Sequence, residues 1–153
     1  MKNAIIMLVL CFTGFVFTHF AFAHDEGHGP MLSDTGKYGG LVSAVVLKSD
    51  AKLGAKAPLV HKAELVRSVD GTTRIYLYSS EMKPLDLKSF NSKGTASMSA
   101  KVKGKWKDVD FPIEQQEGKF IGKMPKVQAK PYNIDVTFKQ DGKELLSAFD
   151  NLD

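Results

Sequence analysis

The stretch from Leu59 to Tyr78 limits the possible folds of this chain more than any other. It consists of two runs rich in β-branched and aromatic residues, separated by the dipeptide Asp70-Gly71. A dipeptide of this type supplies the positive φ angles of a tight hairpin turn. Side chains alternate across a strand, so His61 shares one face with the apolar residues of its run. The sequence therefore predicts an antiparallel hairpin here.

The rest of the chain after residue 37 shows the same pattern of short strand-like runs separated by turn signals. Further runs of strand-like composition cover residues 39–48, 95–102, 106–113, 119–124, 132–139 and 143–149. Turn signals recur about every ten residues, and no stretch keeps a helical period over a dozen residues. We therefore predict an all-β domain over residues 38–153, an antiparallel immunoglobulin-like β-sandwich of seven or eight strands without substantial helix.

The first 23 residues have the pattern of a secretory signal peptide. Lys2 is followed by a mostly apolar run from Ala4 to Phe17, which is too short for a comfortable membrane span. Ala21-Phe22-Ala23 is an A-x-A cleavage site. We expect cleavage after Ala23, a periplasmic or secreted protein that starts at His24, and no stable membrane insertion after cleavage.

The cysteine content and the length limit the kind of domain that the processed chain can form. Cys11 is the only cysteine and would leave with the signal peptide. Disulfides, thiolate metal sites and cysteine nucleophiles are therefore not expected. An exported domain without disulfides fits a bacterial periplasm or exterior. The remaining 130 residues, 24–153, suit one domain with its own core.

The charge balance argues against a nucleic-acid partner. Without Lys2, 20 basic residues stand against 17 acidic ones, and the basic residues are nearly all scattered lysines. Arg67 and Arg74 are the only arginines. A nucleic-acid site would need clustered arginines beside aromatic platforms, so we expect no nucleic acid to bind.

The new amino terminus is the first candidate metal site. Residues 24–37 are polar and glycine-rich, which predicts a mobile arm. His24 would offer its α-amine and imidazole together, a chelate that suits Cu(II), and His28 lies within reach. We expect copper(II), in preference to Zn(II) or Ni(II), and no other cofactor.

His61 is the third candidate ligand, and two interpretations stay open for it. It can be a partly buried histidine whose ring is satisfied by a backbone carbonyl. It can also be a third imidazole that completes the site of His24 and His28 when the arm folds back.

An enzyme and a protein-interaction module are the two other classes of function to weigh against metal binding. The chain carries none of the common nucleophile, phosphate-loop, dinucleotide or zinc-protease motifs, so we expect it not to be an enzyme. The alternative function is a protein-interaction or structural module that binds an envelope protein through a sheet face or edge. Its contact residues would be aromatic: Tyr76, Tyr78, Trp106 and Tyr132.

Several short motifs resemble a known group of proteins. They are Tyr38-Gly39-Gly40, His61-Lys62-Ala63-Glu64-Leu65, Tyr76-Leu77-Tyr78 and Lys83-Pro84. These motifs look like those of small exported β-domains found alongside bacterial heavy-metal efflux systems. A histidine-first β-domain is also similar to the periplasmic copper carriers of copper-resistance systems. The resemblance implies an exported soluble carrier or accessory protein for copper-type metals in the bacterial envelope.

Overall fold

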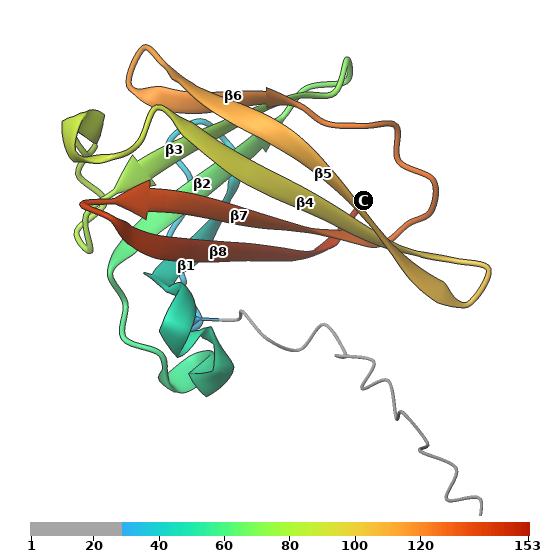
Figure 1. Ribbon diagram of the computed structural model, residues 1–153, viewed down its shortest axis with the longest axis horizontal. Helices are drawn as coiled ribbons and strands as arrows, with labels where there is room; N and C mark the ends of the chain where they lie inside the picture. The colour runs from blue at the N-terminus through green and yellow to red at the C-terminus, as the bar shows by residue number, and fades with distance from the viewer. Residues whose placement is uncertain (1–28) are drawn as a thin grey trace, which may run out of the picture.

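The protein is an eight-stranded antiparallel β-structure. The computed structural model describes residues 29–153, and Figure 1 shows their strands in one curved sheet. The strands are β1 (Leu41–Leu47), β2 (His61–Arg67), β3 (Thr72–Tyr78), β4 (Lys93–Val102), β5 (Lys105–Gln116), β6 (Lys119–Lys123), β7 (Tyr132–Gln140) and β8 (Lys143–Leu152). The all-β class and the strand number agree with the prediction from the sequence.

The predicted immunoglobulin-like sandwich is wrong, because the sheet closes into a barrel. The strand order is β1-β2-β3-β6-β5-β4-β7-β8, and β8 pairs with β1. Alternating side chains show that each strand buries one face, and a sandwich and a barrel both satisfy that pattern. The pairings that decide between them, β3 with β6, β4 with β7 and β8 with β1, join strands that are not consecutive along the chain.

Three of the hairpins have the tight turns that their sequences favour. At Lys103-Gly104, Glu117-Gly118 and Asp141-Gly142, both residues have positive φ, between 48° and 78°. Two successive positive φ angles are what a type I′ turn requires, and its twist matches that of the flanking strands.

The turn at Asp70-Gly71 is built differently from the prediction. Gly71 has a φ of 83°, but Asp70 is not among the residues with positive φ. The backbone N–H of Gly71 donates to the carbonyl of Ser68, so the loop is longer than two residues. The Asp70 carboxylate accepts hydrogen bonds from the backbone N–H and the hydroxyl of Thr72. Side-chain hydrogen bonding of this kind explains why an aspartate stands there without a left-handed backbone.

The barrel interior is filled with side chains. Inward residues from all eight strands form one core cluster, in which Ile75, Ile113, Phe120 and Ile134 are fully buried. The rings of Phe120 and Phe138 lie 5.0 Å apart, and Phe90 contacts Phe120 edge-on at 6.4 Å. An eight-stranded barrel is just wide enough for this filling, so the chemistry of this molecule must lie at its ends and on its outside.

A second, smaller core lies outside the barrel. The 3₁₀ segment η1 (Lys48–Lys56) follows β1 and is kinked at Gly54. The buried members of this outer core come from β1, β8 and the η1 region: Ala44, Val46, Ala51, Ala57 and Leu146. The other helical segment is η2 (Leu87–Ser89). Within residues 29–153, no helix is long and apolar enough to cross a membrane.

Residues Gly29–Gly40, which we call the strap, lie across the outer face of β1 and β2. The described part of the predicted mobile arm, residues 29–37, belongs to the strap. A Cβ atom on Gly29 would stand 2.6 Å from Cβ of Ala44, so the strap approaches β1 closely. Further along, the Lys62 ammonium lies 2.7 Å from the Asp34 carboxylate, and both side chains are largely buried.

Glu64 fastens the end of the strap. Its side chain is fully buried on the outer face of β2. One carboxylate oxygen accepts from the backbone N–H groups of Tyr38 (2.8 Å) and Gly40 (2.9 Å). The other oxygen accepts from the N–H of Lys37 (2.9 Å) and the hydroxyl of Tyr78 (2.7 Å). Four donors therefore converge on one buried carboxylate.

This arrangement predicts that Glu64→Gln lowers the free energy of unfolding. Burial raises the pKa of Glu64, but hydrogen bonds from Gly40, Tyr78, Tyr38 and Lys37 outweigh it and hold the pKa below the ordinary value of 4.5. In the variant an amide NH₂ would face donors, so we expect the free energy of unfolding at pH 7 to fall by about 1.5–3 kcal/mol. Denaturant titration measures this loss. Glu114→Gln, an exposed control on β5, should change it by less than about 0.5 kcal/mol.

The same experiment has a pH signature. A carboxylate whose folded pKa is depressed contributes stability above its unfolded pKa and loses it as the pH falls through the folded value. The wild-type protein should therefore lose stability below pH 4.5, and Glu64→Gln should show a flatter profile there. Parallel profiles for the two proteins would contradict the role of this carboxylate.

A pair of serines on neighbouring strands gives a second prediction. The Ser147 hydroxyl on β8 is buried and has no hydrogen-bond partner among the described residues, whereas the Ser43 hydroxyl on β1 donates to the carbonyl of Ala148 at 2.5 Å. Ser147→Ala should leave stability unchanged or raise it, and Ser43→Ala should lower it by about 0.5–1.5 kcal/mol. Thermal and denaturant unfolding compare the two. A clear loss in Ser147→Ala would show that this hydroxyl has a partner in solution.

Candidate functional site

Strand β2 carries a polar residue at each end, and the alternation along the strand places both on the face toward the barrel interior. His61 begins the strand and Arg67 ends it, while Ala63 and Leu65 between them belong to the barrel core. Because β2 runs the length of the barrel, the two polar side chains lie at opposite ends of the interior. Each of them lines a cavity, and these two places are the candidate sites.

At the first end, His61 is held by Gln140 of β7. Its Nε2 atom lies 2.8 Å from Oε1 of Gln140, and Nε2 of that amide donates to the hydroxyl of Ser89 at 3.1 Å. The ring packs against Phe90 with centroids 5.9 Å apart. The imidazole of His61 packs against Phe90 of the aromatic core, and Gln140 and Ser89 at the rim hold its orientation through hydrogen bonds. The partner predicted for a satisfied histidine, a backbone carbonyl, is replaced here by a side-chain amide.

The hydrogen bonds of this group are satisfied by one tautomer of His61. The amide nitrogen of Gln140 donates to Ser89, and the amide oxygen faces Nε2 of the imidazole, which donates to it if Nε2 carries the proton. The other ring nitrogen, Nδ1, then keeps its lone pair, and no described residue hydrogen-bonds to it. A histidine that binds a metal through one nitrogen usually donates the other N–H to such an acceptor. The arrangement is therefore compatible with ligation through Nδ1.

The cavity beside His61 has a volume of about 380 Å³. Its lining is mixed, with Leu47, Val60, His61, Gln140, Asp141, Lys143 and Leu145. Asp141 adds a carboxylate and Lys143 an opposing positive charge. Within residues 29–153, His61 does not belong to any group of three side chains that could hold a metal ion. His24 and His28, the other predicted ligands, lie outside the described residues.

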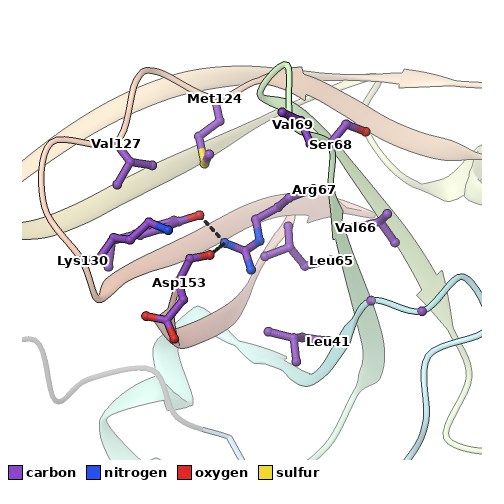
Figure 2. A pocket seen from close by; sticks show the side chains of 13 residues that line it. Leu41, Leu65, Val66, Arg67, Ser68, Val69, Met124, Val127, Lys130 and Asp153 are labelled. Atoms are coloured by element: carbon purple, nitrogen blue, oxygen red, sulfur yellow. Dashed lines mark hydrogen bonds between the residues drawn. The ribbon is translucent and has the colours of Figure 1, made fainter.

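At the opposite end, Arg67 lines a cavity of about 490 Å³ (Figure 2). The guanidinium points into this cavity, with Met124 and Val127 on one side of it and Leu41 on the other. Its Nη1 donates to the hydroxyl of Tyr132 and, at 3.2 Å, to the main-chain oxygen of Asp153.

The partners of Arg67 give it a structural role. Its guanidinium also lies over the ring of Tyr132, 5.4 Å from the centroid. Tyr132 is itself buried in the barrel core. The guanidinium therefore connects β2 to β7 and to the end of β8, and it closes this end of the barrel.

The roles of Glu64 and Arg67 are not predicted from the sequence. Arg67 enters the sequence analysis only in the charge balance, and Glu64 enters it only as part of a short motif. A signal for Arg67 was present, because the alternation that places His61, Ala63 and Leu65 on one face also places Arg67 there. For Glu64 the signal was weaker: an acidic residue in the middle of an otherwise strand-forming run needs donors, but nothing in the sequence says which.

The aromatic residues suggested for an interaction surface are not gathered together. Tyr78 and Tyr132 are buried. Tyr76 is half-buried, and its ring stacks on Tyr38 of the strap at 4.0 Å. Trp106 is 47% exposed at the far end of the β4–β5 hairpin. A single aromatic contact face made of these four residues is therefore not present.

The tautomer of His61 is testable on its own. We expect ¹⁵N NMR of the imidazole at neutral pH to show a protonated Nε2 and an unprotonated Nδ1 in the neutral ring. Gln140→Met should remove the acceptor and let the tautomers mix, while Gln128→Met on an exposed connector should change nothing. A protonated Nδ1 in the wild-type protein would contradict the assignment and with it ligation through that nitrogen.

Comparisons with known proteins do not extend this description. No protein-family model matches the chain, and no curated protein or solved structure is similar enough to count as a match.

Proposed function

We propose that the exported chain is a metal-binding carrier or accessory protein for copper-type metals in the bacterial envelope. The ligands are the α-amine and imidazole of His24, the imidazole of His28, and Nδ1 of His61. The observation that carries the proposal is the hydrogen-bonding of His61, whose Nε2 faces Gln140 while Nδ1 has no partner among the described residues.

The position of the strap determines what a shared site would require. Gly29 packs against Ala44 and Val46 of β1, with a Cβ at that position 2.6 and 2.9 Å from their side chains. These two residues flank Val45, which pairs with His61 across the β1–β2 ladder. Gly29 therefore lies on the outer face of β1, whereas His61 has the inward parity of Ala63 and Leu65. A shared site requires the five residues 24–28, with a reach of roughly 17 Å when extended, to pass the rim of the barrel.

The donor set fits Cu(II) better than the other divalent ions. One amine and three imidazoles are nitrogen ligands, which Cu(II) accepts in a tetragonal arrangement. An α-amine titrates near about 8 and an imidazole near about 6.5, and both must lose a proton to bind. Affinity should therefore be highest near neutral and alkaline pH and should fall steeply below about pH 6. His61 is not a member of the barrel core, so metal removal should leave the fold intact.

Copper titration of the processed protein tests this proposal. A matched protein with one extra residue before His24 keeps every side chain but removes the α-amine from the chelate, so we expect a clear loss of Cu(II) affinity. Gln140→Met should lower affinity by about tenfold if His61 is a ligand, because outer contacts of this kind orient the ring. Calorimetry and the visible spectrum of bound Cu(II) report both effects, and Gln128→Met is the control.

The possible outcomes separate the parts of the proposal. Equal affinity of the extended and unextended proteins would remove the amino-terminal chelate. Unchanged affinity in Gln140→Met, with a loss in the extended protein, would confine the site to the arm. If neither protein binds copper above background, metal binding is wrong and the interaction module becomes the remaining hypothesis.

A further inference from the structure

The β4–β5 hairpin extends beyond the rest of the barrel. In Figure 1 its tip projects away from the other strands, near the side where the C-terminus lies. Lys101 pairs with Trp106 and Val102 with Lys105, and the turn is Lys103-Gly104. The first six residues of β5, 105–110, are all exposed, although they are in a strand. This part of the hairpin is therefore not covered by the barrel on either face.

The tip concentrates positive charge. Four lysines fall within seven residues: Lys101, Lys103, Lys105 and Lys107. All four are exposed, and none forms an ion pair within residues 29–153. The nearest acids of the hairpin, Asp108 and Asp110, come further down β5, toward the barrel. The hairpin is thus positive at its tip, and its first acidic residues after the tip lie in the middle of β5.

The tip also carries the only tryptophan of the chain. Trp106 is 47% exposed, lies opposite Lys101 in the ladder, and is followed by Val109, which is 37% exposed. Tryptophan has an apolar body and one polar N–H, so it is favoured where an apolar phase meets water. A tryptophan among lysines that form no ion pair with the described residues matches the chemistry of a lipid headgroup region, where phosphates face water above an apolar layer.

We propose that the β4–β5 tip docks reversibly on an anionic lipid surface. The four ammonium groups bind headgroup phosphates, and the Trp106 ring enters the headgroup layer without crossing it. Asp108 and Asp110 are repelled by the same surface, so they favour an approach with the tip first. The hairpin has no arginine, and its second aromatic residue, Phe111, is buried, so the tip lacks the arginines and paired aromatic residues that a nucleic-acid platform would use. This proposal is independent of metal binding, because it uses none of the same residues.

The single tryptophan gives a direct measurement. The exported, purified protein is titrated with vesicles of phosphatidylcholine containing phosphatidylglycerol, and with pure phosphatidylcholine vesicles. We expect the Trp106 emission to shift to shorter wavelength only with the anionic vesicles. The shift should reverse on raising the salt concentration, because exposed charges are screened. Equal binding to both vesicle types, or no shift and no co-sedimentation with either, would overturn the proposal.

Matched lysine variants locate the surface. Lys101→Gln with Lys105→Gln should weaken binding to anionic vesicles by roughly 25-fold, about fivefold for each lysine. Lys52→Gln with Lys56→Gln makes the same charge change on the exposed η1 segment and should leave binding nearly unchanged. An equal loss in both double variants would show a general charge effect and overturn the assignment to the tip.

Two further measurements exclude simpler explanations. Thermal unfolding of each variant should match the wild-type protein, since the substituted side chains lie outside the core. Trp106→Ala should reduce co-sedimentation with anionic vesicles, and undiminished binding would remove the ring from the proposal. Single-stranded DNA is titrated in parallel. A stronger response to DNA than to anionic vesicles would overturn the lipid assignment in favour of a nucleic-acid surface.

Discussion

The buried carboxylate of Glu64 is the interaction on which the rest of the outer structure depends. A charge on the outer face of β2 would be expensive to bury without donors, and the end of the strap supplies three backbone N–H groups while β3 supplies a hydroxyl. The donors in turn need an acceptor, because backbone groups without water or a partner are costly. Glu64 therefore fixes the course of the strap. In turn, the hydrogen bonds from the strap offset the free-energy cost of burying the Glu64 carboxylate.

The strap and η1 together give the barrel an outer layer on one side. Leu32 of the strap packs against the small core that Ala44, Val46 and Leu146 form with η1. Lys62, which would otherwise be an exposed lysine on a strand, is covered and paired with Asp34. The outer face of β1 and β2 is thus largely a buried surface, and Gly29 lies on it beside β1.

The sequence predicts the local structure well and the closure of the sheet poorly. Alternation identifies the strands and places His61 on the inward face, and the turn signals between the strands agree with the tight turns observed at Lys103-Gly104 and Asp141-Gly142. Nothing local indicates that β3 pairs with β6 or β8 with β1, since those contacts depend on packing among distant residues. The same limit applies to the site. His61 is found from its own strand, but its partner Gln140 is 79 residues away, and three of the four partners of Glu64 lie more than 20 residues back in the strap.

The filled interior decides where this molecule can interact with anything else. Phe120, Phe138 and the aliphatic residues around them leave no room for a ligand in the middle of the barrel, so polar chemistry is confined to its ends, its arm and its longest hairpin. At one end, Arg67 donates to Tyr132; at the other, Nδ1 of His61 has no hydrogen-bond partner among residues 29–153. The β4–β5 hairpin is longer than its neighbours, and its exposed tip serves no part of the core. The residues proposed to bind metal or lipid therefore lie apart from those that stabilise the fold. Under these two proposals, changes at the His61 rim or the lysine tip should alter binding without unfolding the barrel, whereas a change at Glu64 should destabilise the strap.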